Sequence, residues 1–273
     1  MTGATPPYPN APLALVLLEV RHSATEPLTT SQVATVKAHL LDVAPLPQTD
    51  HALNLQFQVM GVPGAQPSQP ELVQAQRFVS RNRRTCITFT PVTATVETTE
   101  YVGWTEFRQL ASVALAARRA VDPPDGCLRI GLRYIDEIRI PEEVEPDWSK
   151  WVSNSLLPPI PKDLDFSLRP VQQQALVAYS SDTPSHTLTV RYGAVDGPPT
   201  VISAPHLERP ALPPPGPYFL IDTDAAWTIT SGVPTPEFNV DFIIETANEL
   251  HTPAKAVFEA LITEDLRGQV FNG

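Results

Sequence analysis

The order of strand-like and helix-like periodicities constrains the fold of this chain more than any other sequence feature. The first half opens with an apolar strand pattern over Leu13–His22, and a helical stripe over residues 29–41 follows it. Short segments with the apolar alternation of half-buried strands come next, at 51–60, 72–80, 85–89 and 93–98. An amphipathic pattern over 104–121, stopped by two prolines, then predicts a second helix.

The second half shows a similar order. A long strand pattern over 127–140 leads to a short helical segment within 146–157. A hairpin with strands 170–181 and 185–194, and a further strand at 218–230, follow it. Two helices, 239–250 and 252–267, are predicted at the end, because Thr252 can cap a helix and Pro253 suits its first position.

We therefore predict an α+β fold with two tandem β-α-β-β-β-α pseudo-repeats, residues 1–125 and 126–273, packed as one body. The prediction depends on element order, and a chance succession of common elements is the alternative. Two such units resemble the TATA-binding-protein-like and helix-grip architectures. There, helices cover one face of curved antiparallel sheets, and the other face remains free for a ligand. This likeness concerns architecture alone, and architecture does not specify function.

Composition excludes several classes of protein. Lys and Arg total 19 against 30 Asp and Glu, and the formal net charge of −11 disfavours general binding to nucleic-acid phosphates. The longest apolar run, residues 11–18, is too short to cross a membrane, and no basic residue precedes it as in a secretory signal. Two cysteines, Cys86 and Cys127, cannot form a disulfide framework. We expect them as buried thiols of a cytoplasmic protein.

Proline is unusually frequent, with 31 residues, about twice the ordinary usage. The prolines gather in loops, above all at 205–217, where the sequence favours polyproline-II conformation. We interpret these loops as stiff connectors that lower the entropy of the unfolded chain. Recruitment of a partner domain is the alternative.

Five familiar catalytic and cofactor motifs are missing from the sequence. It contains neither of the glycine-rich phosphate-binding patterns, GxxxxGK[ST] and GxGxxG, and neither of the metal motifs, HExxH and CxxC. It also lacks the GxSxG motif of hydrolases. We therefore predict no cofactor, no metal and no catalytic residue.

The strongest polar constellation lies on the two strands that open the halves. Glu19 and Arg21 share one face of the first strand, whereas Arg133 and Asp136 point to opposite faces of the second. One interpretation is a salt bridge between Glu19 and Arg133 that fixes the register between the halves. The functional interpretation is that Arg21, Arg133 and Tyr134 line a concave pocket that binds an anion.

Two further clusters are weaker candidates. Asp222 and Asp224 share a strand face and could hold Mg²⁺ or act as acid and base, although a solvated strand edge is the simpler interpretation. Four arginines surround a hairpin turn and could contact nucleic acid: Arg77, Arg81, Arg83 and Arg84.

Four short motifs follow one another along the chain. They are Asn10-Ala11-Pro12-Leu13, Tyr101-Val102-Gly103-Trp104, Leu132-Arg133-Tyr134-Ile135-Asp136 and Leu250-His251 followed by Phe258. This combination resembles a sporadically distributed family of uncharacterised bacterial and archaeal proteins of similar length. The family strand usually reads Arg-Tyr-Ile-Asn, and here Asp136 takes the place of the asparagine. The patchy distribution implies an accessory or defence-linked role, and no activity is established for the family.

From these observations we predict a non-catalytic binding or assembly component of a bacterial accessory or defence-linked system, with a protein partner or a second copy of itself. One alternative is an enzyme or ligand-binding protein that grips a small anion through Glu19, Arg21, Arg133, Tyr134 and Asp136. A second alternative is a regulatory nucleic-acid-binding module. We expect no association with a membrane.

Overall fold

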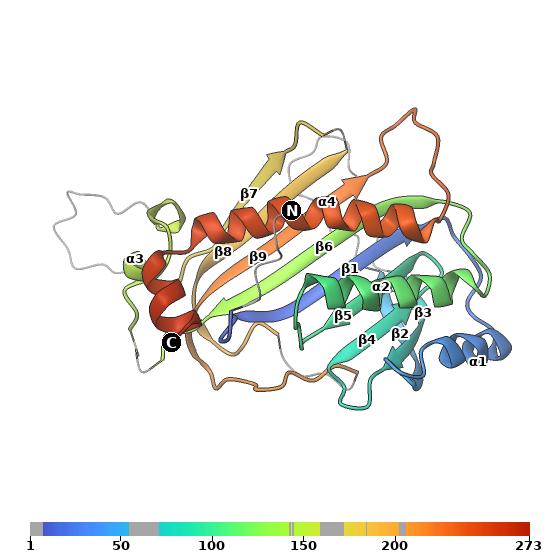
Figure 1. The fold of residues 1–273 in the computed structure, drawn as a ribbon, viewed down its shortest axis with the longest axis horizontal. Coiled ribbons are helices and arrows are strands. Elements are labelled where there is room, and N and C mark those ends of the chain that lie inside the picture. The colour runs from blue at the N-terminus through green and yellow to red at the C-terminus, as the bar shows by residue number, and fades with distance from the viewer. Residues whose placement is uncertain are drawn as a thin grey trace.

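A computed structural model describes residues 8–54, 71–141, 143, 145–158, 172–183, 185–201 and 206–273. In this part of the chain, nine strands form one antiparallel sheet in the order β2-β3-β4-β5-β1-β6-β9-β8-β7 (Figure 1). The strands are β1 (Leu13–His22), β2 (Leu46–Asn54), β3 (Glu71–Val79), β4 (Thr85–Phe89), β5 (Thr93–Thr98), β6 (Cys127–Ile138), β7 (Ala175–Ser180), β8 (His186–Gly197) and β9 (Gly216–Thr228). The helices are α1 (Thr30–His39), α2 (Trp104–Arg119), α3 (Trp148–Trp151) and α4 (Val240–Leu261), with a 3-10 turn at Asn154–Leu156 and a π-helical turn at Leu266–Phe271. The predicted α+β class is confirmed.

The two opening strands, β1 and β6, pair at the centre of the sheet. Their antiparallel register sets Val16 opposite Tyr134 and Leu18 opposite Leu132. On its other side β1 pairs with β5, and β6 pairs with β9, so each opening strand contacts the strand before a long helix. The sheet is therefore continuous across the two halves of the chain.

Helices α2 and α4 lie side by side over one face of this sheet (Figure 1). Their apolar stripes and the strand residues on that face form the main core. Its largest fully buried apolar side chains include Phe78, Leu115, Leu132 and Phe219. None of the helices in the described ranges is long and apolar enough to cross a membrane.

The last long helix corrects the sequence prediction. The chain does not break at Thr252, because α4 runs unbroken through Pro253. Asn239 caps this helix by accepting a hydrogen bond from the Phe242 backbone N–H at 3.1 Å. Leu250 and Ala254 on either side of the proline are buried, so packing on the sheet holds the two parts of the helix in line.

Two further boundaries differ from the prediction. Strand β2 begins at Leu46, before the predicted start at residue 51, and the predicted segment 55–60 lies outside the described residues. Thr93–Thr98 is a separate strand, so the described first half has five strands where the predicted unit has four. The second half has the four strands that the unit requires.

The opposite face of the sheet is crossed by a proline-rich segment, residues 206–215, here called the strap. Leu207 packs into a small cluster on this face with Leu15, Cys86 and Ile135. The Glu208 backbone N–H donates to the Arg83 carbonyl oxygen at 2.6 Å, which ties the second half to the β3–β4 turn of the first. Both cysteines are buried thiols, and burial raises the pKa of Cys86 and of Cys127 to about 12.

Candidate functional site

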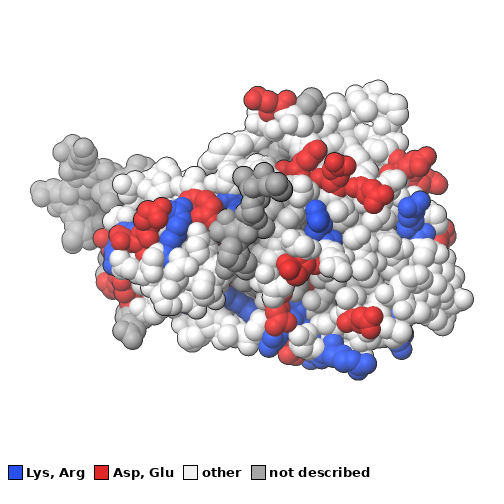
Figure 2. All heavy atoms as spheres, viewed as in Figure 1, with Lys and Arg blue, Asp and Glu red and all other residues white. Residues whose placement is uncertain are grey.

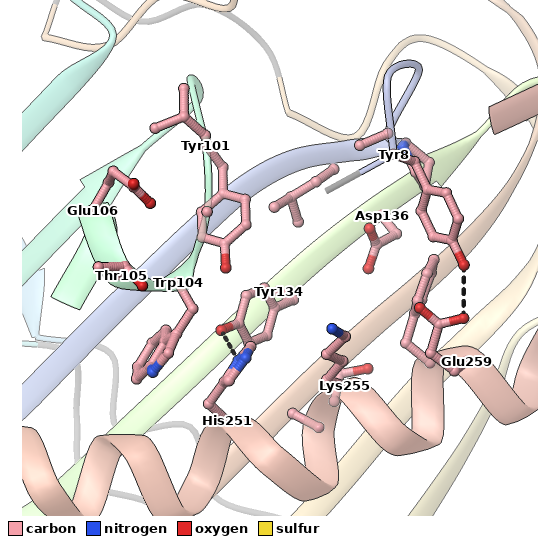
Figure 3. Close-up of a pocket in the computed structure, with 18 residues that line it drawn as sticks. Tyr8, Tyr101, Trp104, Thr105, Glu106, Tyr134, Asp136, His251, Lys255 and Glu259 are labelled. Carbon is pink, nitrogen blue, oxygen red and sulfur yellow. Dashed lines mark hydrogen bonds between the residues drawn. The ribbon is translucent and has the colours of Figure 1, made fainter. Parts of the chain in front are cut away.

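A cavity of about 530 Å³ lies on the helix-covered side of the sheet, where the beginning of α2 approaches the second half of α4 (Figure 3). Strands β6 and β9 and the segment before β1 complete its walls. The large lining side chains are mainly aromatic or apolar: Tyr8, Leu13, Tyr101, Trp104, Tyr134 and Phe258. Because these walls come from both halves of the chain, the cavity exists only in the assembled fold.

Trp104 and His251 join the two helices at one end of the cavity. The indole of Trp104 stacks on the His251 imidazole with ring centroids 4.4 Å apart and an interplanar angle of 6°. Trp104 Nε1 also donates to Asn248 Oδ1 at 2.8 Å. These contacts fix the separation of α2 and α4, and therefore the width of the cavity.

A hydrogen bond connects this helix pair to the sheet. Tyr134 Oη lies 2.8 Å from His251 Nδ1 (Figure 3). Burial, with a contribution from Lys255, lowers the pKa of His251 to about 4. Burial raises the pKa of Tyr134 well above its usual value. At neutral pH the imidazole is therefore uncharged and the phenol protonated, so the pair adds no net charge to the cavity.

Asp136 is the most unusual polar group of the site. Its side chain belongs to β6, is only 6% exposed and points into the cavity (Figure 3). No described residue donates a hydrogen bond to it. Burial, and secondarily the charge of Asp222, raises the pKa of Asp136 to about 8. At neutral pH this carboxyl is therefore mainly protonated and can both donate and accept a hydrogen bond.

The remaining two carboxylates of the cavity differ in their surroundings. Glu259 accepts hydrogen bonds from Tyr8 Oη at 2.8 Å and from Arg267 Nε at 3.1 Å. Glu106 is exposed and belongs to the first turn of α2, where its negative charge stabilises the helix N-terminus.

A further polar group, besides Asp136, faces the cavity without a partner among the described residues. The Lys255 ammonium group points into it from α4 (Figure 3), and no hydrogen bond or ion pair engages it there. Thr223 on β9 also lines the cavity, but its Oγ1 is fully buried behind the cavity surface. Asp136 and Lys255 are therefore the groups whose hydrogen bonds a bound molecule or solvent can complete.

The structure separates the five residues predicted to bind a ligand. Tyr134 and Asp136 line the cavity, whereas Glu19, Arg21 and Arg133 belong to the opposite face of the sheet. Arg21, Arg133 and Tyr134 therefore do not share a pocket, because consecutive residues of a strand point to opposite faces.

The charged residues on that opposite face are ion-paired. Glu19 Oε1 lies 2.8 Å from Arg21 Nε and 3.4 Å from Arg129 Nη1. Arg133 makes two hydrogen bonds of 2.7 Å to Asp222. In the register, Arg133 lies opposite Leu17 and Glu19 lies opposite Gly131, so Glu19 and Arg133 are diagonal and not direct cross-strand neighbours.

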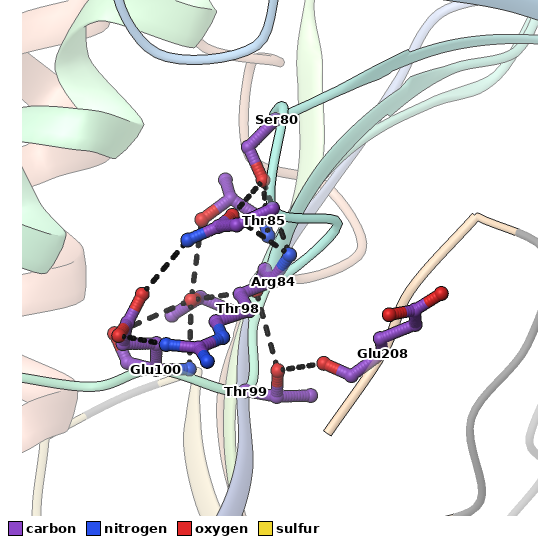
Figure 4. A network of polar contacts seen from close by, with 8 residues as sticks. Ser80, Arg84, Thr85, Thr98, Thr99, Glu100 and Glu208 are labelled. Atoms are coloured by element: carbon purple, nitrogen blue, oxygen red, sulfur yellow. Dashed lines mark hydrogen bonds and ion pairs between the residues drawn. The ribbon is translucent and has the colours of Figure 1, made fainter. Parts of the chain in front are cut away.

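The two weaker candidate clusters are also engaged in ion pairs. Asp224 accepts from Arg129 Nη2 at 3.2 Å, and Asp222 binds Arg133. Around the β3–β4 turn, Arg84 binds Glu100 within a hydrogen-bond network that reaches Glu208 (Figure 4). Across the described ranges, no three His, Cys, Asp or Glu side chains lie close enough together to hold a metal ion.

Sequence reasoning missed several residues of the cavity. His251, Lys255 and Phe258 share one face of α4, but the predicted break at Thr252 concealed this spacing. A second signal was available in the motifs that carry the family resemblance. Each of them contributes to the cavity wall: Ala11, Pro12, Leu13, Tyr101, Val102, Gly103, Trp104, Tyr134, Asp136, His251 and Phe258.

Comparisons of this chain with protein-family models, with curated proteins and with solved structures find no match. The resemblance to the sporadically distributed family therefore stays a prediction.

Proposed function

We propose that this protein binds a small organic molecule in the cavity between α2, α4 and the sheet. The observation that carries the proposal is the buried Asp136 carboxyl, which points into the cavity without a hydrogen-bond partner among the described residues. A ligand in the cavity would supply the hydrogen bonds that this carboxyl lacks within the protein. A binding function agrees with the absence of known catalytic motifs from the sequence.

The size and lining of the cavity support the same proposal. Small-molecule sites commonly measure about 300–1,000 Å³ and combine apolar walls with a few polar groups that fix orientation. A cavity of about 530 Å³ lies within this range. The aromatic walls favour a ligand with a flat or branched apolar body.

We also propose that the two halves are copies of one ancestral unit. The support comes from the pairing of each opening strand with the strand before a long helix, β1 with β5 and β6 with β9. In this view the cavity is the groove where α2 of one copy meets α4 of the other. This proposal concerns the origin of the fold, and ligand binding does not depend on it.

A role in assembly is a second candidate, and strand β7 favours it. This strand forms one edge of the sheet, and its Leu176 and Tyr179 side chains are 50% and 45% exposed. We propose that a second copy adds its own β7 there, as edge strands readily do. Light scattering after gel filtration should then show a dimer that Leu176→Lys converts to a monomer. A wild-type monomer would contradict this role.

Ligand binding can be tested with three probes that share an indole ring: indole-3-ethanol, indole-3-propionate and tryptamine. We expect at least one to bind in equilibrium dialysis. Thr105→Trp should weaken that binding about tenfold or more, because residue 105 is exposed and lines the cavity, so the new indole fills the entrance without disturbing the core.

The matched control is Gln109→Trp, an exposed position of the same helix outside the cavity lining. It should leave the affinity within about twofold of wild type. If no probe binds, or if Thr105→Trp and Gln109→Trp bind equally well, the proposed function is wrong.

A further inference from the structure

The balance of charge at the cavity indicates what class of ligand it takes. Three carboxyl groups and one ammonium group line the cavity. Glu259 is paired with Arg267, and Glu106 lies over the N-terminus of α2. Asp136 is buried on β6, where its neutral form is favoured. In the described part of the chain, Lys255 is the one Lys or Arg that lines the cavity, and neither it nor the exposed Glu106 has an ion-pair partner.

Hydrogen-bond donors are also in excess at this site. The Lys255 ammonium group has three donors and no acceptor. A protonated Asp136 adds an O–H that faces the cavity. A ligand that completes these bonds must present acceptor oxygens, and a negative charge would balance Lys255.

We propose that the ligand is an organic carboxylate with an aromatic or branched apolar body. This inference rests on the proposed function. The ligand carboxylate pairs with Lys255 Nζ and accepts a hydrogen bond from the Asp136 carboxyl, and the ligand body lies against Tyr101 and Tyr134. An organic cation held by the aromatic rings is the competing ligand class, since electron-rich ring faces attract cations.

The proposal makes binding depend on pH through Asp136. The titratable groups that interact electrostatically with Asp136 are Tyr134 on its own strand, Tyr101 before α2 and Asp222 on β9. The other titratable groups that line the cavity are Tyr8, Glu106, His251, Lys255 and Glu259. Burial and Asp222 raise the pKa of Asp136 to about 8, so above this pH an ionised Asp136 repels the ligand carboxylate. A cationic ligand would show the opposite dependence.

The same indole series tests this class. At pH 6.5, wild-type protein should bind indole-3-propionate about tenfold more tightly than indole-3-ethanol or tryptamine. Lys255→Met should remove this preference, whereas Lys37→Met, which removes an equal charge from the exposed side of α1, should keep it. Affinity for indole-3-propionate should fall about tenfold from pH 6.5 to pH 9.5, and Asp136→Asn should flatten most of that fall.

The possible outcomes separate the two proposals. If none of the three probes binds, the proposed function fails. If indole-3-ethanol or tryptamine binds as tightly as indole-3-propionate, and Thr105→Trp blocks it, the cavity is a binding site but its ligand is not a carboxylate. A preference that survives Lys255→Met, or a pH profile that Asp136→Asn leaves unchanged, would also overturn the inference.

Discussion

Two adjacent carboxyl groups on β6, Asp136 and Glu137, meet opposite surroundings. The Glu137 side chain is fully buried and binds Arg139 at 2.7 Å and Arg209 at 2.9 Å. Asp136, one residue away, faces the aromatic cavity on the other side of the sheet without an ion pair. Strand alternation alone therefore makes one carboxylate a structural anchor and the other a group available to a ligand.

The raised pKa of Asp136 predicts how stability depends on pH. Its pKa rises from 3.8 to about 8 on folding, so between these values the folded protein binds a proton that the unfolded chain has released. Stability should therefore fall as pH rises from about 4 to about 8, by up to about 1.4 kcal/mol per pH unit. The Asp136→Asn variant should lack this pH dependence. Its free energy of unfolding should therefore exceed that of wild type by the largest margin at pH 9. Urea unfolding at pH 5, 7 and 9 measures both proteins, and parallel profiles would contradict the assignment.

The lowered pKa of His251 predicts a change in stability at acidic pH. Its pKa is lowered to about 4, so between the ordinary histidine value and pH 4 the unfolded chain binds a proton that the folded protein does not. Stability from the neutral imidazole is thus present at neutral pH and is lost as pH falls toward 4. An imidazole resonance assigned by comparison with His251→Asn should titrate near pH 4 in NMR spectra. Titration near pH 6.5 would show that the ring is not buried as described.

At the scale of elements, α4 is the one whose extent decides whether the cavity forms. The helix carries His251, Lys255 and Phe258 to one wall, and this requires it to continue past Pro253. Proline at this position removes a backbone donor and crowds the preceding turn. Burial of the apolar face of α4 offsets that cost.

Pro253→Ala should therefore stabilise the protein, because Pro253 is exposed and its ring contributes little packing. Alanine has the higher helix propensity, but it also increases the conformational entropy of the unfolded chain. The net gain in the free energy of unfolding should be about 1–2 kcal/mol. Thr252→Ala, at the exposed neighbouring position, should stay within about 0.5 kcal/mol of wild type. Thermal unfolding of the three proteins measures this, and a less stable Pro253→Ala would mean that the helix is not continuous there.

Most elements were predictable because their signals are local. Alternation placed β1, β4 and β5 at their observed bounds, and the amphipathic stripe placed the start of α2 at Trp104. Thr252 and Pro253 form a good local signal for a new helix, and packing on the sheet overrode it. The cavity was not predictable, because it depends on the contact between α2 and α4, which the local pattern of neither helix specifies.

At the scale of the whole molecule, the strap joins the two halves across the face that the helices leave open. The Glu208 carbonyl oxygen accepts from Thr99 Oγ1 at 2.6 Å at one end of the polar network (Figure 4). Arg209 anchors the strap to the buried Glu137. The interpretation of this proline-rich loop as a stiff connector stays a prediction. Acidic side chains are spread over the opposite, helix-covered surface (Figure 2).

Loss of the strap anchor should destabilise the whole molecule. Arg209→Met removes one of the guanidinium groups that bind the buried Glu137. This loss should lower the free energy of unfolding by about 2–4 kcal/mol. Arg81→Met, at an exposed position of the β3–β4 turn, should change stability by less than about 0.5 kcal/mol. Guanidinium unfolding compares the two variants. Equal stabilities would show that the strap does not support the sheet.

The most direct test of the account is the carboxyl ¹³C resonance of Asp136, identified as the signal that Asp136→Asn removes. In protein labelled at aspartate carboxyl carbons, this resonance should titrate near pH 8 and should shift saturably when indole-3-propionate is added at pH 6.5. Thr105→Trp should abolish the ligand-induced shift. An Asp136 resonance that titrates near pH 4, and that does not respond to any of the three indole probes, would contradict the claim that this cavity is a binding site.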